Sequence, residues 1–247
     1  MPRRPKRSAR NSASALAVAA ALSAPARAQD GVLSRLDAAY PEAAPAIAKL
    51  AASEAANPAP HDPLTHATLA DLFRQSYPAG APVAPPPPGF DPGRYRDQAL
   101  FDLLYGDCRK GQVASNLVDV VWLPKTWGHV VRFTERQGAA DALRAVSAEI
   151  DAMPLAISRA AWPTAGTYAC RRVADNGQPS MHAYAAAIDL NLRASDYWLW
   201  RHSAPWVNRM PPQIVAAFER HGFIWGGRWS HYDTMHFEYR PELFVPK

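Results

Sequence analysis

The sequence of 247 residues contains only two cysteines, Cys108 and Cys170. Neither has a second cysteine at C-x-x-C spacing, which argues against a cysteine-bound metal ion. In an exported protein the two could form one intramolecular disulfide, and otherwise they would be two buried free thiols. The sequence leaves both possibilities open.

Long hydrophobic runs are also missing. A membrane-spanning helix needs roughly 18–20 continuous apolar residues, and no segment of the chain has them. No internal repeat is visible either. We therefore expect no transmembrane segment, and the sequence gives no indication of the oligomeric state.

Acidic residues are absent from residues 1–28, which contain an apolar run from Ala13 to Leu22 and then the small-x-small sequence Ala26-Arg27-Ala28. The basic residues of this segment are Arg3, Arg4, Lys6, Arg7, Arg10 and Arg27. A basic start, an apolar run and a small-x-small cleavage site are the three parts of a secretory signal peptide. We expect cleavage after Ala28 and a mature protein in the periplasm or outside the cell; the alternative is a disordered basic tail.

The basic leader also accounts for the net charge of +5. Without residues 1–28 the chain has 21 basic and 22 acidic residues, a net charge of −1. The excess of positive charge that nucleic-acid binding requires is therefore absent from the expected mature protein. We expect no nucleic-acid partner.

Composition divides the rest of the chain in two. Residues 29–94 are rich in Ala and Pro, and their Pro-rich stretch at 82–89 is typical of an extended linker. Two weak helical patterns occur there, one around Leu36 and one that begins with Asp62 as its N-cap. No motif suggests a binding function, so we interpret this N-terminal region as a spacer or a loosely packed flank.

Residues 95–247 have the composition of a globular domain. The patterns predict strands at 117–123, 129–133, 167–173 and 234–239, and helices at 139–152 and 212–221. Strands and helices without a regular β-α-β alternation indicate an α+β fold. We expect a small antiparallel sheet flanked by helices.

Two short segments of this domain, 180–189 and 230–238, contain candidate metal ligands. His182, Asp189 and His236 provide two imidazoles and one carboxylate, the set that leaves one position of a tetrahedral zinc ion open for water. Neither a regular helix nor a regular strand brings His182 and Asp189 together across seven residues. The chain must therefore bend after His182. We expect a single zinc centre, one Zn²⁺ per chain, because the nitrogen and oxygen donors suit zinc.

The same segments resemble the two motifs of the M15 metallopeptidases. Ser180, His182, Ala187 and Asp189 match the motif S-x-H-x-x-G-x-A-x-D, and the sequence DTMHFE at 233–238 matches D-x-x-H-F-E. Ala185 occupies the position of the glycine in the first motif, where a positive φ would strain an alanine. The resemblance extends over roughly residues 100–245.

By this resemblance the protein is a zinc metallopeptidase that acts on peptidoglycan stem peptides. We favour D-Ala-D-Ala carboxypeptidase activity over L-Ala-D-Glu endopeptidase activity. Asp233 has the position of the family's general base, and Arg171 is the candidate for stabilising negative charge on the substrate. Glu238 could anchor a ligand imidazole from behind. The rival interpretation is a zinc-containing cell-wall-binding module without activity.

Overall fold

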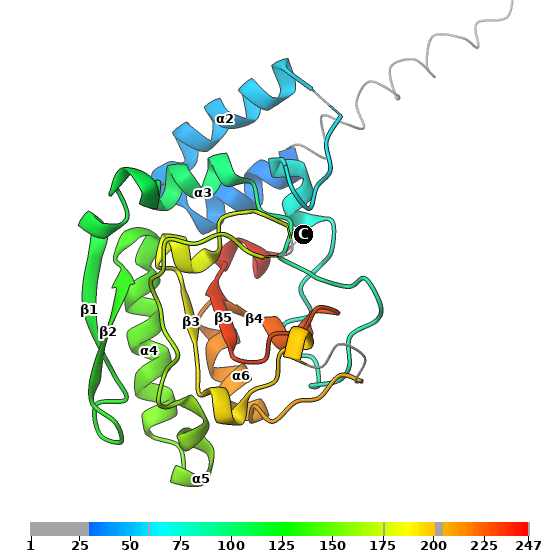
Figure 1. Ribbon diagram of the computed structural model, residues 1–247. Helices are drawn as coiled ribbons and strands as arrows, with labels where there is room; N and C mark the ends of the chain where they lie inside the picture. Colours follow the sequence, from blue (N-terminus) through cyan, green and yellow to red (C-terminus); the bar gives the residue numbers. More distant parts are fainter. Residues whose placement is uncertain (1–29, 59, 175, 201–204, 247) are drawn as a thin grey trace, which may run out of the picture.

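The computed structural model describes residues 30–58, 60–174, 176–200 and 205–246. The expected signal peptide, residues 1–28, lies outside the described residues. Within them the chain forms helices and small antiparallel sheets (Figure 1), so the α+β class expected from the sequence is confirmed. None of the helices in these ranges is long and apolar enough to cross a membrane.

A three-stranded antiparallel sheet positions the two motif segments. Its strands are β3 (Ala187–Asp189), β5 (His236–Tyr239) and β4 (Phe223–Trp225), in the order β3-β5-β4. The register places His236 opposite Asp189. The sheet therefore joins two segments that are 47 residues apart in the sequence.

A hairpin and two helices enclose the main core. β1 (Leu117–Trp122) pairs with β2 (His129–Thr134), α4 (Ala139–Asp151) packs against β1, and α6 (Pro212–Arg220) packs against β4. α4 forms because Leu143, Val146 and Ile150 lie at helical spacing and give it one apolar face, which is fully buried. The core continues into the central sheet through Ile188, Phe223, Trp225 and Phe237.

The helix ends follow local sequence signals. α6 has Pro211 as its N-cap and Pro212 as its first residue, and Gly222 with φ of +79° follows its C-cap. This is the arrangement in which proline and glycine fit helix ends best. α3 (Gln98–Tyr105) begins at Asp97, whose side chain accepts a hydrogen bond from the Leu100 backbone. The described chain also contains a helix at 30–39, α2 (Ala44–Ala56), α5 (Leu155–Ser158) and short 3-10 helices, among them Leu69–Phe73 and Met181–Tyr184.

The N-terminal region forms a second core against the first motif. Leu36, Tyr40, Ile47 and Leu72 are fully buried and belong to one cluster with α3 and with Tyr184. Figure 1 shows α2 beside α3, and the two helices are in contact. These side chains are therefore packed parts of the structure. The domain boundary after residue 94 stays a prediction.

The helix expected from Asp62 is absent. Asp62 Oδ1 accepts a hydrogen bond from the Leu64 backbone, but residues 63–65 form only a turn. Thr68 and Asp71 then form a capping box that starts the short helix Leu69–Phe73. Asp62 thus caps only the turn at residues 63–65, and the short helix begins after the second cap, Thr68. The Pro-rich residues 81–87 contain neither helix nor strand.

Candidate metal centre

The first motif folds into a short helix, one left-handed residue and a strand. The Ser180 side chain accepts a hydrogen bond from the His182 backbone N–H (3.3 Å) and caps the helix Met181–Tyr184. Ala185 then adopts φ of +53°, and β3 follows. The predicted bend after His182 is present, and it turns Asp189 back toward His182.

The second motif is a tight turn that leads into β5. The backbone N–H of Asp233 donates to the Gly226 carbonyl (3.0 Å), and the N–H of His236 donates to the Asp233 carbonyl (3.2 Å). His236 is thereby the first residue of β5, opposite Asp189. The first motif therefore places Asp189 on β3, and the second places His236 on the adjacent strand β5.

The three candidate ligand atoms form a nearly equilateral triangle. His182 Nε2 lies 3.1 Å from Asp189 Oδ1 and 3.2 Å from His236 Nδ1, and His236 Nδ1 lies 3.0 Å from Asp189 Oδ1. Ligand atoms around a tetrahedral ion with bonds of about 2.0–2.1 Å are about 3.3 Å apart. The three residues could therefore hold a metal ion, and their donor set suits Zn²⁺.

The outer ring nitrogens of both histidines are already engaged. His182 Nδ1 lies 2.8 Å from the Thr167 carbonyl oxygen, and His236 Nε2 lies 3.0 Å from Glu238 Oε2. Carbonyl and carboxylate oxygens only accept hydrogen bonds, so these two nitrogens carry the protons. The opposite nitrogens, His182 Nε2 and His236 Nδ1, are therefore the ones that would bind a cation once they carry no proton.

Charges around the triangle stabilise one another. Burial alone would raise the pKa of Asp189, but His182 and His236 hold it well below its usual range. Burial alone would lower the pKa of His236, yet its hydrogen bonds to Asp189 and Glu238 raise it to about 10. A proton therefore competes with a metal ion for this imidazole.

Asp233 lies beside the triangle and has a perturbed carboxyl group. Burial, and after it the Asp189 carboxylate, raises the pKa of Asp233 to about 7, against the smaller effects of His236 and Arg171. Its Oδ1 is buried and accepts no hydrogen bond from any residue that the structure describes. A carboxyl group of this kind could exchange a proton with water or substrate near neutral pH.

A cavity of about 100 Å³ opens beside the triangle. Its lining combines the motif residues with cationic and aromatic side chains: Arg94, Arg96, Arg171, Tyr197, Trp198, Trp229, His231, Asp233 and His236. Arg94 and Arg96 could not be selected from the sequence, because only tertiary packing brings them to the motifs. Trp198 and Trp229 could not be told from core tryptophans such as Trp225 by composition alone.

Arg171 reaches this cavity from an irregular segment, so the strand expected at 167–173 is wrong. Isolated bridges, Gly166 to Asp189 and Arg172 to Pro179, are the pairings recorded for this part of the described chain. Without a continuous ladder the alternation of side chains along a strand does not apply. Arg171 and Arg172 both line a second cavity of about 220 Å³, and Arg171 also lines the cavity at the triangle.

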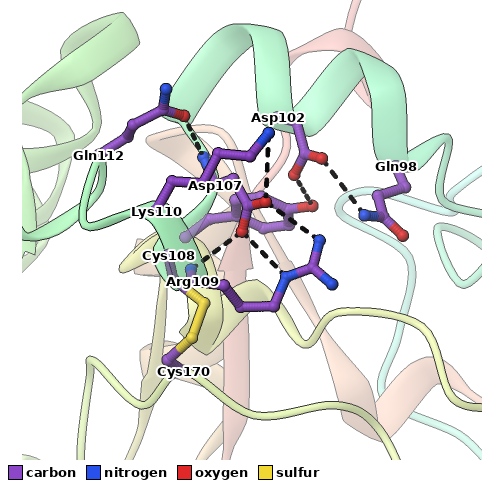
Figure 2. Close-up of a disulfide and its surroundings, with 9 residues drawn as sticks. Gln98, Asp102, Asp107, Cys108, Arg109, Lys110, Gln112 and Cys170 are labelled. Atoms are coloured by element: carbon purple, nitrogen blue, oxygen red, sulfur yellow. Dashed lines mark hydrogen bonds and ion pairs between the residues drawn. A yellow bond between two sulfur atoms is a disulfide. The ribbon is translucent and has the colours of Figure 1, made fainter.

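Cys108 and Cys170 form a disulfide with their Cα atoms 5.7 Å apart. Figure 2 shows Cys108 beside Asp107, whose side chain accepts a hydrogen bond from the Arg109 backbone (2.9 Å) and ion-pairs with the Arg109 guanidinium. Cys170 directly precedes Arg171. The disulfide therefore anchors the segment that carries Arg171 to this capped turn.

The fold and the site together define a mixed α+β protein with a candidate His-Asp-His metal centre. Residues 174–239 match the M15 peptidase family model described as D-alanyl-D-alanine carboxypeptidase. The resemblance to the M15 family is thus confirmed for this segment, which includes all three candidate ligands. The match and the candidate centre indicate a metallopeptidase. No curated protein and no solved structure matches the chain.

Proposed function

We propose that the protein is an exported zinc metallopeptidase that hydrolyses peptide bonds in peptidoglycan stem peptides, with D-Ala-D-Ala carboxypeptidase activity as its main reaction. His182, Asp189 and His236 hold one Zn²⁺ per chain, Asp233 is the general base, and Arg171 stabilises negative charge on the substrate. The observation that carries this proposal is the donor triangle, whose member His236 lines one cavity together with Asp233 and Arg171.

The roles follow from the chemistry of each group. A bound Zn²⁺ supplies a Lewis acid that polarises the scissile carbonyl and acidifies water. Asp233 takes the proton of the attacking water and passes it to the leaving amine, for which a pKa of about 7 is well suited. Arg171 provides a fixed positive charge beside the oxygen on which negative charge develops.

Charge complementarity supports an anionic peptide end as the substrate. A stem peptide that ends in D-Ala carries a free carboxylate, and Arg171 lines the cavity beside Arg94 and Arg96, which pair with Asp91 and Glu238. Oppositely charged surfaces of this kind steer and orient a ligand. The description of the matching family model points to the same substrate.

Two observations support export. The first is the leader sequence of residues 1–28, and the second is the disulfide between Cys108 and Cys170, a bond that persists in oxidising compartments. A periplasmic or extracellular location would place the enzyme beside its proposed substrate.

Mass spectrometry of muropeptides tests the proposal. Pentapeptide monomers and cross-linked dimers are incubated with the zinc-loaded protein. Loss of one terminal D-Ala is the expected product, whereas release of a stem fragment would identify an endopeptidase. If no product forms although elemental analysis confirms one zinc per chain, the remaining interpretation is a non-catalytic cell-wall-binding module.

Three variants separate the roles in the same assay. His182→Ala is expected to lose both zinc and turnover, and Asp233→Asn to keep zinc and lose turnover by more than about 100-fold. Asp119→Asn makes the same chemical change on an exposed residue of β1, at 72% side-chain exposure, and should have no effect. Undiminished turnover in Asp233→Asn would exclude Asp233 as the base.

A further inference from the structure

A chain of buried charged groups leads away from the metal centre. Glu238 Oε2 accepts hydrogen bonds from His236 Nε2 (3.0 Å) and from Arg96 Nη2 (2.6 Å). The other oxygen of Glu238 accepts from Arg240 Nη1 (3.0 Å). Glu238 and Arg240 are fully buried, and Arg96 is 5% exposed. The carboxylate behind His236 is thus held between two cations out of contact with water.

The chain continues to the N-terminal region. Arg240 Nε donates to Glu242 Oε1 (2.5 Å), and the Tyr40 hydroxyl donates to Glu242 Oε2 (2.5 Å). Arg240 Nη1 also donates to the Gly93 carbonyl (2.6 Å). Because Arg240 is shared between Glu238 and Glu242, it supplies only part of the positive charge that Glu238 needs.

Arg96 supplies the rest of that charge from the segment that leads into α3. Its guanidinium carbon lies 5.9 Å from the centroid of the Trp229 ring, and the same ring lies 5.6 Å from the His236 ring. Arg96 thus contacts both the carboxylate and the aromatic side chain that adjoin His236. Its planar group fixes the direction of the hydrogen bond to Glu238, which a point charge would not.

We infer that Arg96 is a positioning residue of the metal centre, although it lies outside both motifs and is not one of the three candidate ligands. It holds the Glu238 carboxylate against His236 Nε2, so that His236 Nδ1 faces Asp189 and the ion. Residues that orient a metal-bound imidazole in this way change metal affinity by about 10–100-fold when they are removed. The inference rests on the metal centre proposed above.

A second buried ion pair provides a matched control. Arg228 Nε lies 2.7 Å from Glu219 Oε1, and the two residues are each 6% exposed. Glu219 also accepts a hydrogen bond from the Tyr77 hydroxyl (2.7 Å) of the N-terminal region. This pair has the burial and the long-range connection of the Arg96–Glu238 pair, but it contacts none of the three ligands.

The experiment measures zinc affinity by competition with a chelator, in the full protein and in Arg96→Met, Arg96→Lys and Arg228→Met. We expect the zinc dissociation constant to rise about 10–100-fold in Arg96→Met and to rise less in Arg96→Lys, which keeps the charge. Arg228→Met should lower the melting temperature of the zinc-free protein and leave the zinc dissociation constant unchanged.

The outcomes are separable. An unchanged zinc dissociation constant in folded Arg96→Met, or the same weakening in Arg228→Met, would overturn the inference. If Arg96→Met does not fold, Arg96→Lys decides, because weaker zinc binding supports the role and unchanged binding refutes it. If the parent protein binds zinc no more tightly than His182→Ala does, the proposed centre itself fails.

Discussion

Ala185 is a buried alanine in a left-handed conformation, with φ of +53°. This conformation costs an L-residue roughly 1–2 kcal/mol. The chain accepts that cost because the bend between His182 and Asp189 requires it. The motif comparison located the position, since Ala185 replaces a glycine, but only the structure gives the sign of φ.

Replacing Ala185 by glycine should therefore stabilise the protein. Glycine adopts a positive φ without steric cost, although it loses more entropy on folding. We expect Ala185→Gly to raise the free energy of unfolding by about 0.5–1 kcal/mol in urea denaturation. Ala183→Gly, in the helix Met181–Tyr184, is the control and should destabilise. Equal losses in both variants would show that Ala185 is not strained.

The protonation state of Asp233 predicts a pH dependence. Its pKa is raised to about 7, and only the ionised carboxylate can accept a proton from water. At saturating zinc, kcat/KM should therefore rise with pH along an acid limb centred at about 7 or below, since a bound cation favours the ionised form. A pH profile with zinc content checked at each point tests this. Activity that falls as the pH rises through this limb would contradict the assignment.

At the scale of elements, the disulfide joins two segments that are 62 residues apart. Cross-linking a loop of this length stabilises a protein by about 4 kcal/mol through the entropy of the unfolded chain. We expect the double variant Cys108→Ser, Cys170→Ser to lose that much free energy of unfolding in urea. A reducing agent should lower the stability of the parent and leave the variant unchanged. Parent-like stability of the variant would contradict the expectation.

Helices and strands with a periodic pattern of apolar side chains could be predicted from the sequence. Segments whose structure depends on single contacts could not. β1, β2, α4 and α6 were all expected within a few residues, because each has a clear pattern of apolar side chains. The segment 167–173 has strand-like residues but pairs only through isolated bridges. Sequence patterns do not report whether a partner strand runs alongside for long enough to form a ladder.

At the scale of the whole molecule, the N-terminal region completes the core behind the first motif. Its buried side chains, Leu36, Tyr40, Ile47 and Leu72, pack in the same cluster as Tyr184. Their Ala- and Pro-rich surroundings masked this in the sequence, since composition alone does not separate a linker from a packed flank. The same packing explains why Arg96 could not be assigned to the site beforehand.

Removal of residues 1–94 should prevent cooperative folding. The deletion exposes the apolar cluster around Tyr184 and takes away the Tyr40 and Gly93 partners of the buried Glu242 and Arg240. Uncovered apolar surface and unpaired buried charge each destabilise strongly. Thermal unfolding followed by circular dichroism should show a broad transition or none. Removal of residues 1–28 is the control and should leave a sharp one; a sharp transition in both would contradict the prediction.

The pairing of β3 with β5 makes the candidate metal site sensitive to strand register. Asp189 and His236 face one another across this pair, and a slip of one residue would turn one of them to the opposite face of the sheet. A chain with the wrong alignment could not assemble the donor triangle. If the site binds zinc as proposed, the ratio of bound zinc to protein in a preparation would therefore report the fraction of molecules with correctly aligned strands.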